Sequence, residues 1–327
     1  MLYNKCHIGG EVMTKLEKDL EIAHALIQDT NKYREYYSIF EKMWPFATIN
    51  MKGYLEPFEL ENKKCMTIQG SSDHIFELFL KHPEKIIGID SNPLTEYYYY
   101  LKQAAFAVLE NSEQYLKFFR WIDYPSFCKN NMHVFDKDIF EEICKYLQGE
   151  AKVFWEELFI CYDPKKIRKG LFNEIDETNN NALYKALNYL SEDNYQYIRK
   201  NREKINFQFL NTDIRNIDKE LTETLDFITL SNIIIYAHHM YKDNHLQEYK
   251  KLIELLSTKL NKKGNIVAGY LYDVENEEDY RDIYNKSLRD SVFYEPEYNY
   301  CYFKKMRDLH CARDTENHDA CLIYTKK

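Results

Sequence analysis

The feature that most constrains the fold is an alternation of short apolar strands and amphipathic helices within residues 63–110. A strand pattern at 65–69 leads into a turn, and a helix pattern follows until Pro83. A second apolar strand at 85–89 ends at Asp90, and Asn92-Pro93 is typical of a helix start, with Asn as N-cap and Pro in the first turn. This order predicts parallel βαβ units in which the second strand lies beside the first.

The rest of the chain completes an α/β fold with a mostly parallel sheet. Further strands are predicted at 205–210, 225–230 and 265–270, and the segments 298–303 and 320–324 are expected to pair as an antiparallel hairpin. The helix after Asn244 is expected to end at 261–264, where two lysines precede a glycine. Apolar spacing predicts an N-terminal helix within 11–43, and 111–204 shows helical patterns without a convincing strand. The expected organisation is an N-terminal helical segment (1–62), a Rossmann-like SAM-binding domain (63–110 and 205–327) and a helical insertion (111–204) that caps the acceptor.

Composition narrows the class of protein. Lys plus Arg number 44 against 53 for Asp plus Glu, and this net charge of −9 argues against a nucleic-acid binder, which needs a basic face. Hydrophobic residues make up 45% of the chain, enough for a substantial core. The sequence shows no signal-peptide pattern, no membrane-spanning apolar run and no CxxC pair among its 8 cysteines. We therefore expect a cytoplasmic protein with reduced thiols and no integral membrane segment.

Polar residues follow each of the first four predicted parallel strands. In an open α/β sheet, ligands bind beyond the carboxyl ends of the strands, where the strand order reverses. These loops are therefore expected to converge on one crevice. The predicted cofactor-binding residues are Gly70, Ser71, Ser72 and Asp73 after the first strand, Asp90, Ser91 and Asn92 after the second, Asp213 after the third, and Ser231 and Asn232 after the fourth.

Asp90 is the most informative of these residues. An acid at the end of the second strand, about 20 residues beyond a glycine turn, is where such folds hydrogen-bond the ribose hydroxyls of an adenosine. A role as helix N-cap is the alternative, but Ser91 and Asn92 can fill it. The turn at Gly70 lacks the GxGxxG pattern, so it favours a cofactor without a pyrophosphate, whose amino-acid end meets N–H groups at a helix start. S-adenosylmethionine (SAM) is such a cofactor.

The segments 66–73, 89–93 and 101–105 resemble the SAM:diacylglycerol 3-amino-3-carboxypropyl transferase family of betaine-lipid synthesis. Shorter similarities lie at 154–155, 169–172 and 230–232, and the resemblance runs thinly from about residue 40 to 270. It implies a class I methyltransferase-like Rossmann fold, with Gly70, Asp90, Asp213 and Ser231 around SAM. It also implies transfer of the aminocarboxypropyl arm of SAM, rather than its methyl group, to a small-molecule or lipid-like acceptor.

The chemistry required of the protein is modest, because the sulfonium of SAM is already activated for displacement. The protein must orient the reactants and can supply a base for the acceptor. Tyr236 and His238, beyond the fourth strand, are the candidate catalytic residues for this proton. Three hypotheses stay open: aminocarboxypropyl transfer with release of methylthioadenosine, ordinary methyl transfer with release of S-adenosylhomocysteine, and a non-catalytic SAM-binding module.

Metal binding is a weaker interpretation of two other clusters. Three histidines lie at 238, 239 and 245, without a carboxylate at HExxH spacing. The last 27 residues hold a second group, with spacings that match no common zinc pattern: Cys301, His310, Cys311, His318 and Cys321. The sequence therefore predicts no metal site, and it favours core positions for the cysteines of this group.

Overall fold

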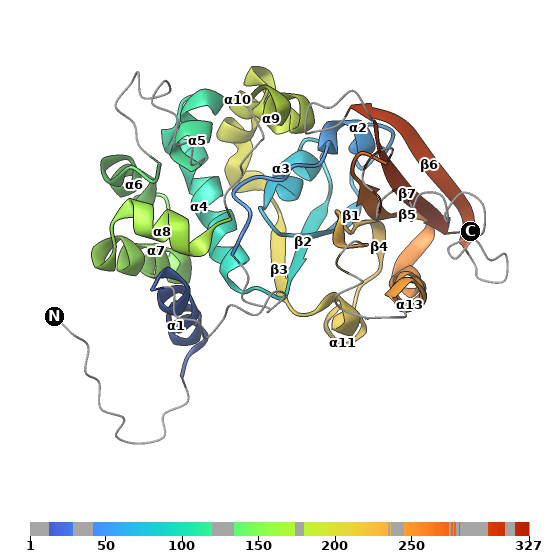
Figure 1. Ribbon diagram of the computed structural model, residues 1–327, viewed down its shortest axis with the longest axis horizontal. Coiled ribbons are helices and arrows are strands. Elements are labelled where there is room, and N and C mark those ends of the chain that lie inside the picture. Colours follow the sequence, from blue (N-terminus) through green and yellow to red (C-terminus); the bar gives the residue numbers. More distant parts are fainter. Residues whose placement is uncertain are drawn as a thin grey trace.

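A seven-stranded sheet forms the centre of the protein (Figure 1). The computed structural model describes residues 13–28, 42–119, 134–173, 180–234, 236, 245–274, 276, 278, 281, 300–310 and 318–326. Along the sheet the strand order is β3-β2-β1-β4-β5-β7-β6. The strands are β1 (Lys64–Ile68), β2 (Lys85–Asp90), β3 (Phe207–Asn211), β4 (Leu225–Thr229), β5 (Leu260–Leu271), β6 (Tyr300–His310) and β7 (His318–Lys326).

The first five strands are parallel, and the last two change direction. β1 pairs in parallel with β2 and β4, β3 pairs with β2, and β5 pairs with β4. β7 lies antiparallel between β5 and β6. The predicted neighbours β1 and β2 and the predicted C-terminal hairpin are therefore confirmed. A mostly parallel α/β sheet with this strand order is the class I methyltransferase-like Rossmann fold, so the expected fold class is confirmed as well.

Helices precede the sheet, connect its strands and form a block between β2 and β3. Figure 1 shows α5–α10 gathered at the side of the sheet where β3 lies, with β6 and β7 at the opposite side. The helices are α1 (Lys15–Ile27), α2 (Met51–Leu55), α3 (Asp73–Phe79), α4 (Leu94–Val108), α5 (Ser112–Phe119), α6 (Lys137–Cys144), α7 (Gly149–Cys161), α8 (Pro164–Leu171), α9 (Asn180–Ala186), α10 (Glu192–Asn201), α11 (Ile217–Glu220) and α13 (His245–Thr258), with short 3-10 turns η3 (Asn188–Leu190), η4 (Arg202–Lys204) and η5 (Ile214–Asn216). Of the helix predicted within 11–43, α1 is observed, and residues 29–41 lie outside the described residues. None of the helices just named is long and apolar enough to cross a bilayer.

Both faces of the sheet are buried, as neighbouring side chains of β1 show, because they point to opposite faces. Cys65 belongs to the apolar cluster that contains the helical block, and Met66 belongs to the cluster built with α11 and α13. Such two-sided burial is typical of parallel sheets. The helical block is joined to the sheet through α4, where the ring of Tyr97 stacks on Phe154 at 4.1 Å and Trp155 Nε1 donates to the Tyr97 carbonyl at 2.8 Å. Trp155 is therefore a core residue.

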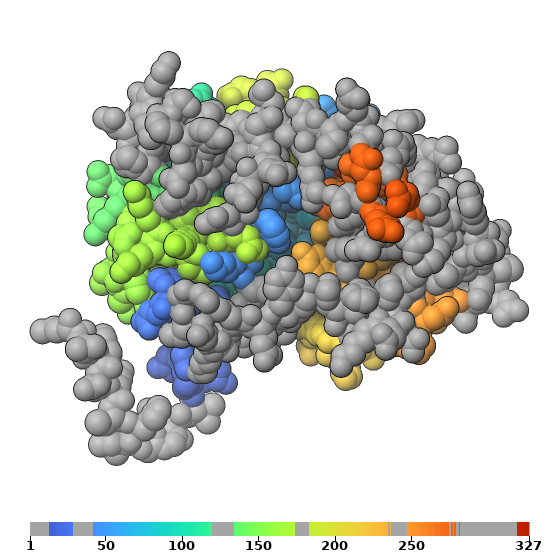
Figure 2. Space-filling view, viewed as in Figure 1, coloured from blue at the N-terminus to red at the C-terminus, as the bar shows by residue number. Residues whose placement is uncertain are grey.

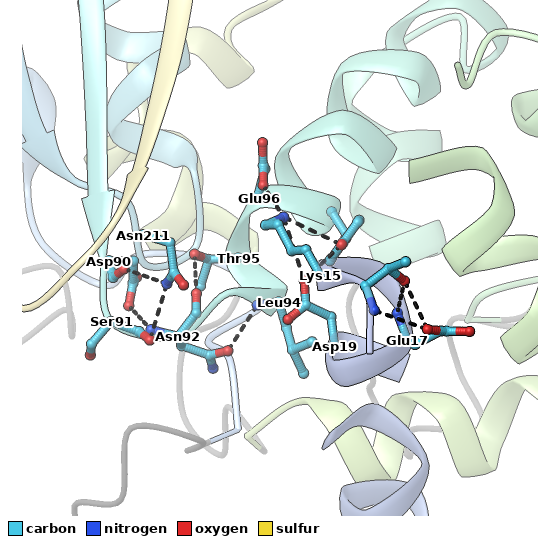
Figure 3. Close-up of polar contacts among 12 residues, drawn as sticks. Lys15, Glu17, Asp19, Asp90, Ser91, Asn92, Leu94, Thr95, Glu96 and Asn211 are labelled. Atoms are coloured by element: carbon cyan, nitrogen blue, oxygen red, sulfur yellow. Dashed lines mark hydrogen bonds and ion pairs between the residues drawn. The ribbon is translucent and has the colours of Figure 1, made fainter. Parts of the chain in front are cut away.

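The loop between β2 and α4 behaves largely as its sequence predicts. Asn92 Oδ1 accepts the N–H of Leu94 at 3.0 Å, and Pro93 already has helical dihedral angles. α4 is also tied to α1, because Lys15 Nζ lies 2.9 Å from Glu96 Oε2 and 3.4 Å from Asp19 Oδ2 (Figure 3). The β2–α4 connection, which carries the most informative predicted residues, is therefore well anchored.

The end of the helix after residue 244 differs from the prediction. α13 ends before 261–264, and this segment instead belongs to β5, which begins at Leu260. Five residue steps of β5 lie opposite two of β4, so the segment forms a bulge. Lys263 has φ +65°, and Asn261 Nδ2 donates to Asp226 Oδ1 at 2.9 Å. Pairing with β4 therefore overrides a local signal that is typical of a helix end.

Candidate functional site

A cavity of about 370 Å³ lies beyond the carboxyl ends of the strands. It lies at the switch point of the sheet, because β2 and β3 extend from one side of β1, and β4 and β5 extend from the other. The residues that line it are Lys42, Met43, Trp44, Phe46, Ala47, Thr48, Ile49, Ile68, Gly70, Ser71, His74, Asp90, Ser91, Asn92, Thr95, Ser231, Asn232, Ile233, Tyr236 and Tyr272.

Most of the residues predicted to form the site line this cavity together. They are Gly70, Ser71, Asp90, Ser91, Asn92, Ser231, Asn232 and Tyr236. Ser72, Asp73 and Asp213 are not among the lining residues, and His238 lies outside the described residues. Loops after β1, β2 and β4 therefore meet as expected, whereas the loop after β3 does not contribute a lining residue.

Asp90 links the loop after β1 to the loop after β2, and Figure 3 shows its contact with Asn92. Its Oδ2 accepts the N–H of Gly70 at 3.0 Å, and its Oδ1 accepts the N–H of Asn92 at 2.9 Å. The Thr95 side chain and the N–H of Ser91 also donate to this carboxylate, so the start of α4 contributes to its environment as well. Burial raises the pKa of Asp90 to about 6, and the bonds from Asn92 and Gly70 oppose this rise. Asn92 performs the capping at α4, which leaves Asp90 to the cavity.

The loop after β1 turns sharply before α3. Gly70 has φ +46° and Ser72 has φ +68°, and the N–H of Ser72 donates to the carbonyl of Gln69 at 2.6 Å. A side chain at residue 70 would meet no atom, so its backbone conformation is what favours glycine there. This turn brings Ser71 to the cavity wall and places Asp73 behind it.

Asp73 and Asp213 face protein groups. Asp73 is fully buried, and its Oδ1 lies 2.6 Å from Lys102 Nζ and accepts the hydroxyl of Tyr189 at 2.7 Å. Asp213 begins η5 and pairs with Arg215, whose Nε lies 2.9 Å from Oδ1. The observed contacts of these two carboxylates are therefore structural ones.

One wall of the cavity consists of residues 42–49, which the motif analysis did not identify. Several contacts hold the backbone of this segment. Among them, the N–H of Met43 donates to the carbonyl of Leu171, the carbonyl of Met43 accepts the N–H of Asn173, and the N–H of Ala47 donates to Asp73 Oδ2 at 2.5 Å. In the space-filling view, blue residues from early in the chain lie between green residues of the helical block and orange residues near 250–280 (Figure 2). Such contacts between distant segments leave no local pattern in the sequence, so motif reasoning does not find this wall.

Two further groups of the wall were also missed. His74, at the start of α3, is 3% exposed, and its Nε2 has no hydrogen-bond partner among the described residues. Burial lowers its pKa to about 3, so the imidazole is neutral. Across the cavity, the hydroxyls of Thr48 and Tyr272 lie 2.9 Å apart. The sequence held one indication that His74 lies at the cavity, because this residue directly follows the predicted turn and lies in the first turn of the helix.

A second cavity, of about 590 Å³, lies between α4 and the start of α7. It is lined by residues such as Tyr100, Gln148 and Arg202 and by none of the predicted site residues. Among the described residues, no group of three or more His, Cys, Asp or Glu could hold a metal ion. Cys321 is fully buried in β7, which confirms a core position for that cysteine.

The fold and the cavity define a Rossmann-like α/β protein with a cavity at the switch point of its sheet. No family model and no curated protein matches the sequence. Among solved structures, a methyltransferase from Pyrococcus furiosus is similar, with 11% identity over 96% of this chain and 99% of that chain and a TM-score of 0.37. The N-methyltransferase NodS from Bradyrhizobium japonicum shares 9% identity over 84% and 91% of the two chains, with a TM-score of 0.33. Magnesium protoporphyrin IX methyltransferase from Synechocystis, solved with bound SAM, shares 9% identity over 98% of this chain and 87% of that chain, with a TM-score of 0.31. Because these scores are low, the fold assignment rests on the strand order of this chain itself.

Proposed function

We propose that this protein is a SAM-dependent transferase that uses the cavity beside Asp90. The observation that carries the proposal is the position of this carboxylate, at the end of β2 and at the switch point, hydrogen-bonded to the glycine turn after β1. An acid at this place is suited to the two hydroxyls of a ribose. The alternative assignment of Asp90 as a helix cap is weakened, because Asn92 caps α4.

The chemistry of the lining supports a nucleoside cofactor without phosphate groups. A volume of about 370 Å³ is in the range of small-molecule sites. Among the described residues that line the cavity, Lys42 is the only lysine or arginine, so this part of the wall lacks the cluster of cations that a pyrophosphate favours. Asp90 would bind the ribose, and the backbone around Gly70 and Ser71 would meet the amino-acid end of the cofactor.

The proposed reaction is transfer of the 3-amino-3-carboxypropyl group to a small acceptor. Bound SAM supplies a sulfonium whose carbons are activated for displacement. The residues of this chain bind and orient the reactants, and aromatic side chains such as Trp44 and Phe46 restrict water on one wall. Tyr236, which lines the cavity, handles the acceptor proton in this proposal, together with His238. The sequence resemblance to aminocarboxypropyl transferases is the support for this choice of group over the methyl group.

The helical region 111–204 was expected to cap the acceptor. Within its described parts, 111–119, 134–173 and 180–204, no residue lines the cavity, and the wall on that side comes from 42–49. We therefore propose that this region has a structural role behind α4. The three-part domain organisation and the cytoplasmic location stay predictions.

The identity of the nucleoside product tests the proposed reaction. When the purified protein is incubated with SAM and a cell extract, we expect chromatography to detect methylthioadenosine, because displacement at the propyl carbon releases it. S-adenosylhomocysteine in its place would mean that the methyl group is transferred. Lipid and aqueous fractions of the extract, tested separately, distinguish a lipid-like from a small-molecule acceptor. Binding of SAM without either product would contradict a catalytic function, and absence of binding would contradict the proposal as a whole.

The pH dependence of ligand binding provides a second check. With a pKa of about 6, Asp90 is ionised at pH 7.5 and largely protonated at pH 5. Protonation removes acceptor capacity, so the affinity for S-adenosylhomocysteine is expected to fall as the pH falls through 6, by about tenfold between pH 7.5 and 5. Calorimetry at several pH values measures this. Asp90→Asn should bind weakly with a flat pH profile, and an equally steep profile in that variant would contradict the assignment to Asp90.

A further inference from the structure

A buried ion pair lies directly behind the loop that follows β1. Lys102 Nζ, from α4, lies 2.6 Å from Asp73 Oδ1, and both side chains have 0% exposure. Burial lowers the pKa of Lys102 to about 8, and the contact with Asp73 opposes this change, so the lysine remains mainly protonated at neutral pH. The rings of Phe46, Tyr98 and Phe119 surround the ammonium at 4.3, 4.8 and 5.9 Å. The pair therefore carries two compensated charges in a buried region that is rich in aromatic rings.

Both members of the pair hold Ser71, which lines the cavity on the other side of the loop. Lys102 Nζ donates to the carbonyl of Ser71 at 2.8 Å, and Ser71 Oγ donates to Asp73 Oδ2 at 2.7 Å. Asp73 also accepts the hydroxyl of Tyr189, from the helical block, and the N–H of Ala47, from the cavity wall. One carboxylate thus joins the loop, the wall and the helical block.

We infer that Lys102 and Asp73 are positioning residues that adapt the loop at Gly70 and Ser71 to a ligand with a free amino-acid arm. This inference rests on the proposed function and concerns which end of the nucleoside the loop recognises. A lone Asp73 carboxylate behind the loop would repel the carboxylate of that arm, and Lys102 cancels its charge while it fixes the carbonyl of Ser71. Ligands that lack the arm do not depend on the pair.

Two nucleosides separate arm recognition from ribose recognition. S-adenosylhomocysteine carries the amino-acid arm, and methylthioadenosine lacks it. In Lys102→Met, we expect calorimetry to show affinity for S-adenosylhomocysteine reduced by about tenfold or more, with affinity for methylthioadenosine unchanged within about threefold. The matched control is Lys85→Met, which removes a lysine paired with Glu223 at 2.5 Å at the start of β2, and it should change neither affinity.

A second variant covers the case in which Lys102→Met does not fold. Ser71→Ala removes only the bond to Asp73 and leaves the buried pair in place, so it should lower the affinity for S-adenosylhomocysteine by about threefold and spare methylthioadenosine. Equal losses for both ligands, or no loss in a folded variant, would overturn the inference. If the wild-type protein binds neither nucleoside, the proposed function itself fails. If it binds both and the variants keep the same ratio, only the role of the pair is wrong.

Discussion

Replacing Asp90 by alanine is expected to weaken binding of S-adenosylhomocysteine by about 1–3 kcal/mol, or roughly 5- to 160-fold in dissociation constant. The carboxylate lines the cavity, so in the proposed complex its removal leaves the ribose hydroxyls without their partner. The loss should extend to adenosine and methylthioadenosine, because all three ligands share the ribose. Calorimetry with the three ligands measures the effect.

A matched acid allows the ribose assignment to be separated from a general loss of negative charge. Asp213 also follows a parallel strand, but it pairs with Arg215 and does not line the cavity. Asp213→Ala is therefore expected to leave all three affinities unchanged. Because Asp90 also accepts from Gly70 and Asn92, circular dichroism must show that Asp90→Ala keeps its fold. Unchanged affinity in the folded variant would refute the ribose assignment, and with it the central support for the proposed function.

The part of the site that was predictable from sequence is the part defined by local chain order. Apolar runs that end in polar loops identify the parallel strands, and the rules of α/β sheets then bring their carboxyl ends together. Gly70, Asp90 and Ser231 accordingly line one cavity. The same reasoning cannot say which loops reach the ligand. The chain after β3 turns into η5, where Asp213 caps the turn with its side chain, and this loop contributes no lining residue.

The unpredicted part depends on contacts between distant segments. The wall at 42–49 is held by contacts with distant segments, as in the bond of the Met43 N–H to the carbonyl of Leu171. Asp73 was expected to meet the cofactor because it follows the glycine turn, but its carboxylate faces Lys102 and Tyr189 from α4 and η3. The spacing of apolar residues along the sequence does not indicate such contacts between distant segments. The bulge at 261–264 has the same origin, since pairing with β4 decides its conformation.

The buried pair behind the loop should also dominate the stability of this region. Lys102→Met is expected to lower the free energy of unfolding by about 3–5 kcal/mol, because it leaves the Asp73 carboxylate buried without its cation. This is a large fraction of the roughly 5–15 kcal/mol that stabilises a typical domain. Urea denaturation, followed by circular dichroism, measures the change. Lys85→Met removes a partly exposed pair with Glu223 and should cost at most about 1 kcal/mol.

The double variant Asp73→Asn/Lys102→Met separates the cost of the unpaired charge from the cost of lost contacts. It removes both charges, so it is expected to recover most of the stability lost in Lys102→Met, as neutral replacements of buried ion pairs often do. The single acceptor oxygen of the asparagine can take the N–H of Ala47, and its amide N–H can donate to the hydroxyl of Tyr189, which keeps the helical block and the cavity wall attached to α3. If the double variant is as unstable as the single one, the pair acts through packing rather than charge. In that case the charge-compensation part of the inferred selectivity would lose its physical basis, and only the fixing of Ser71 by hydrogen bonds would remain to explain it.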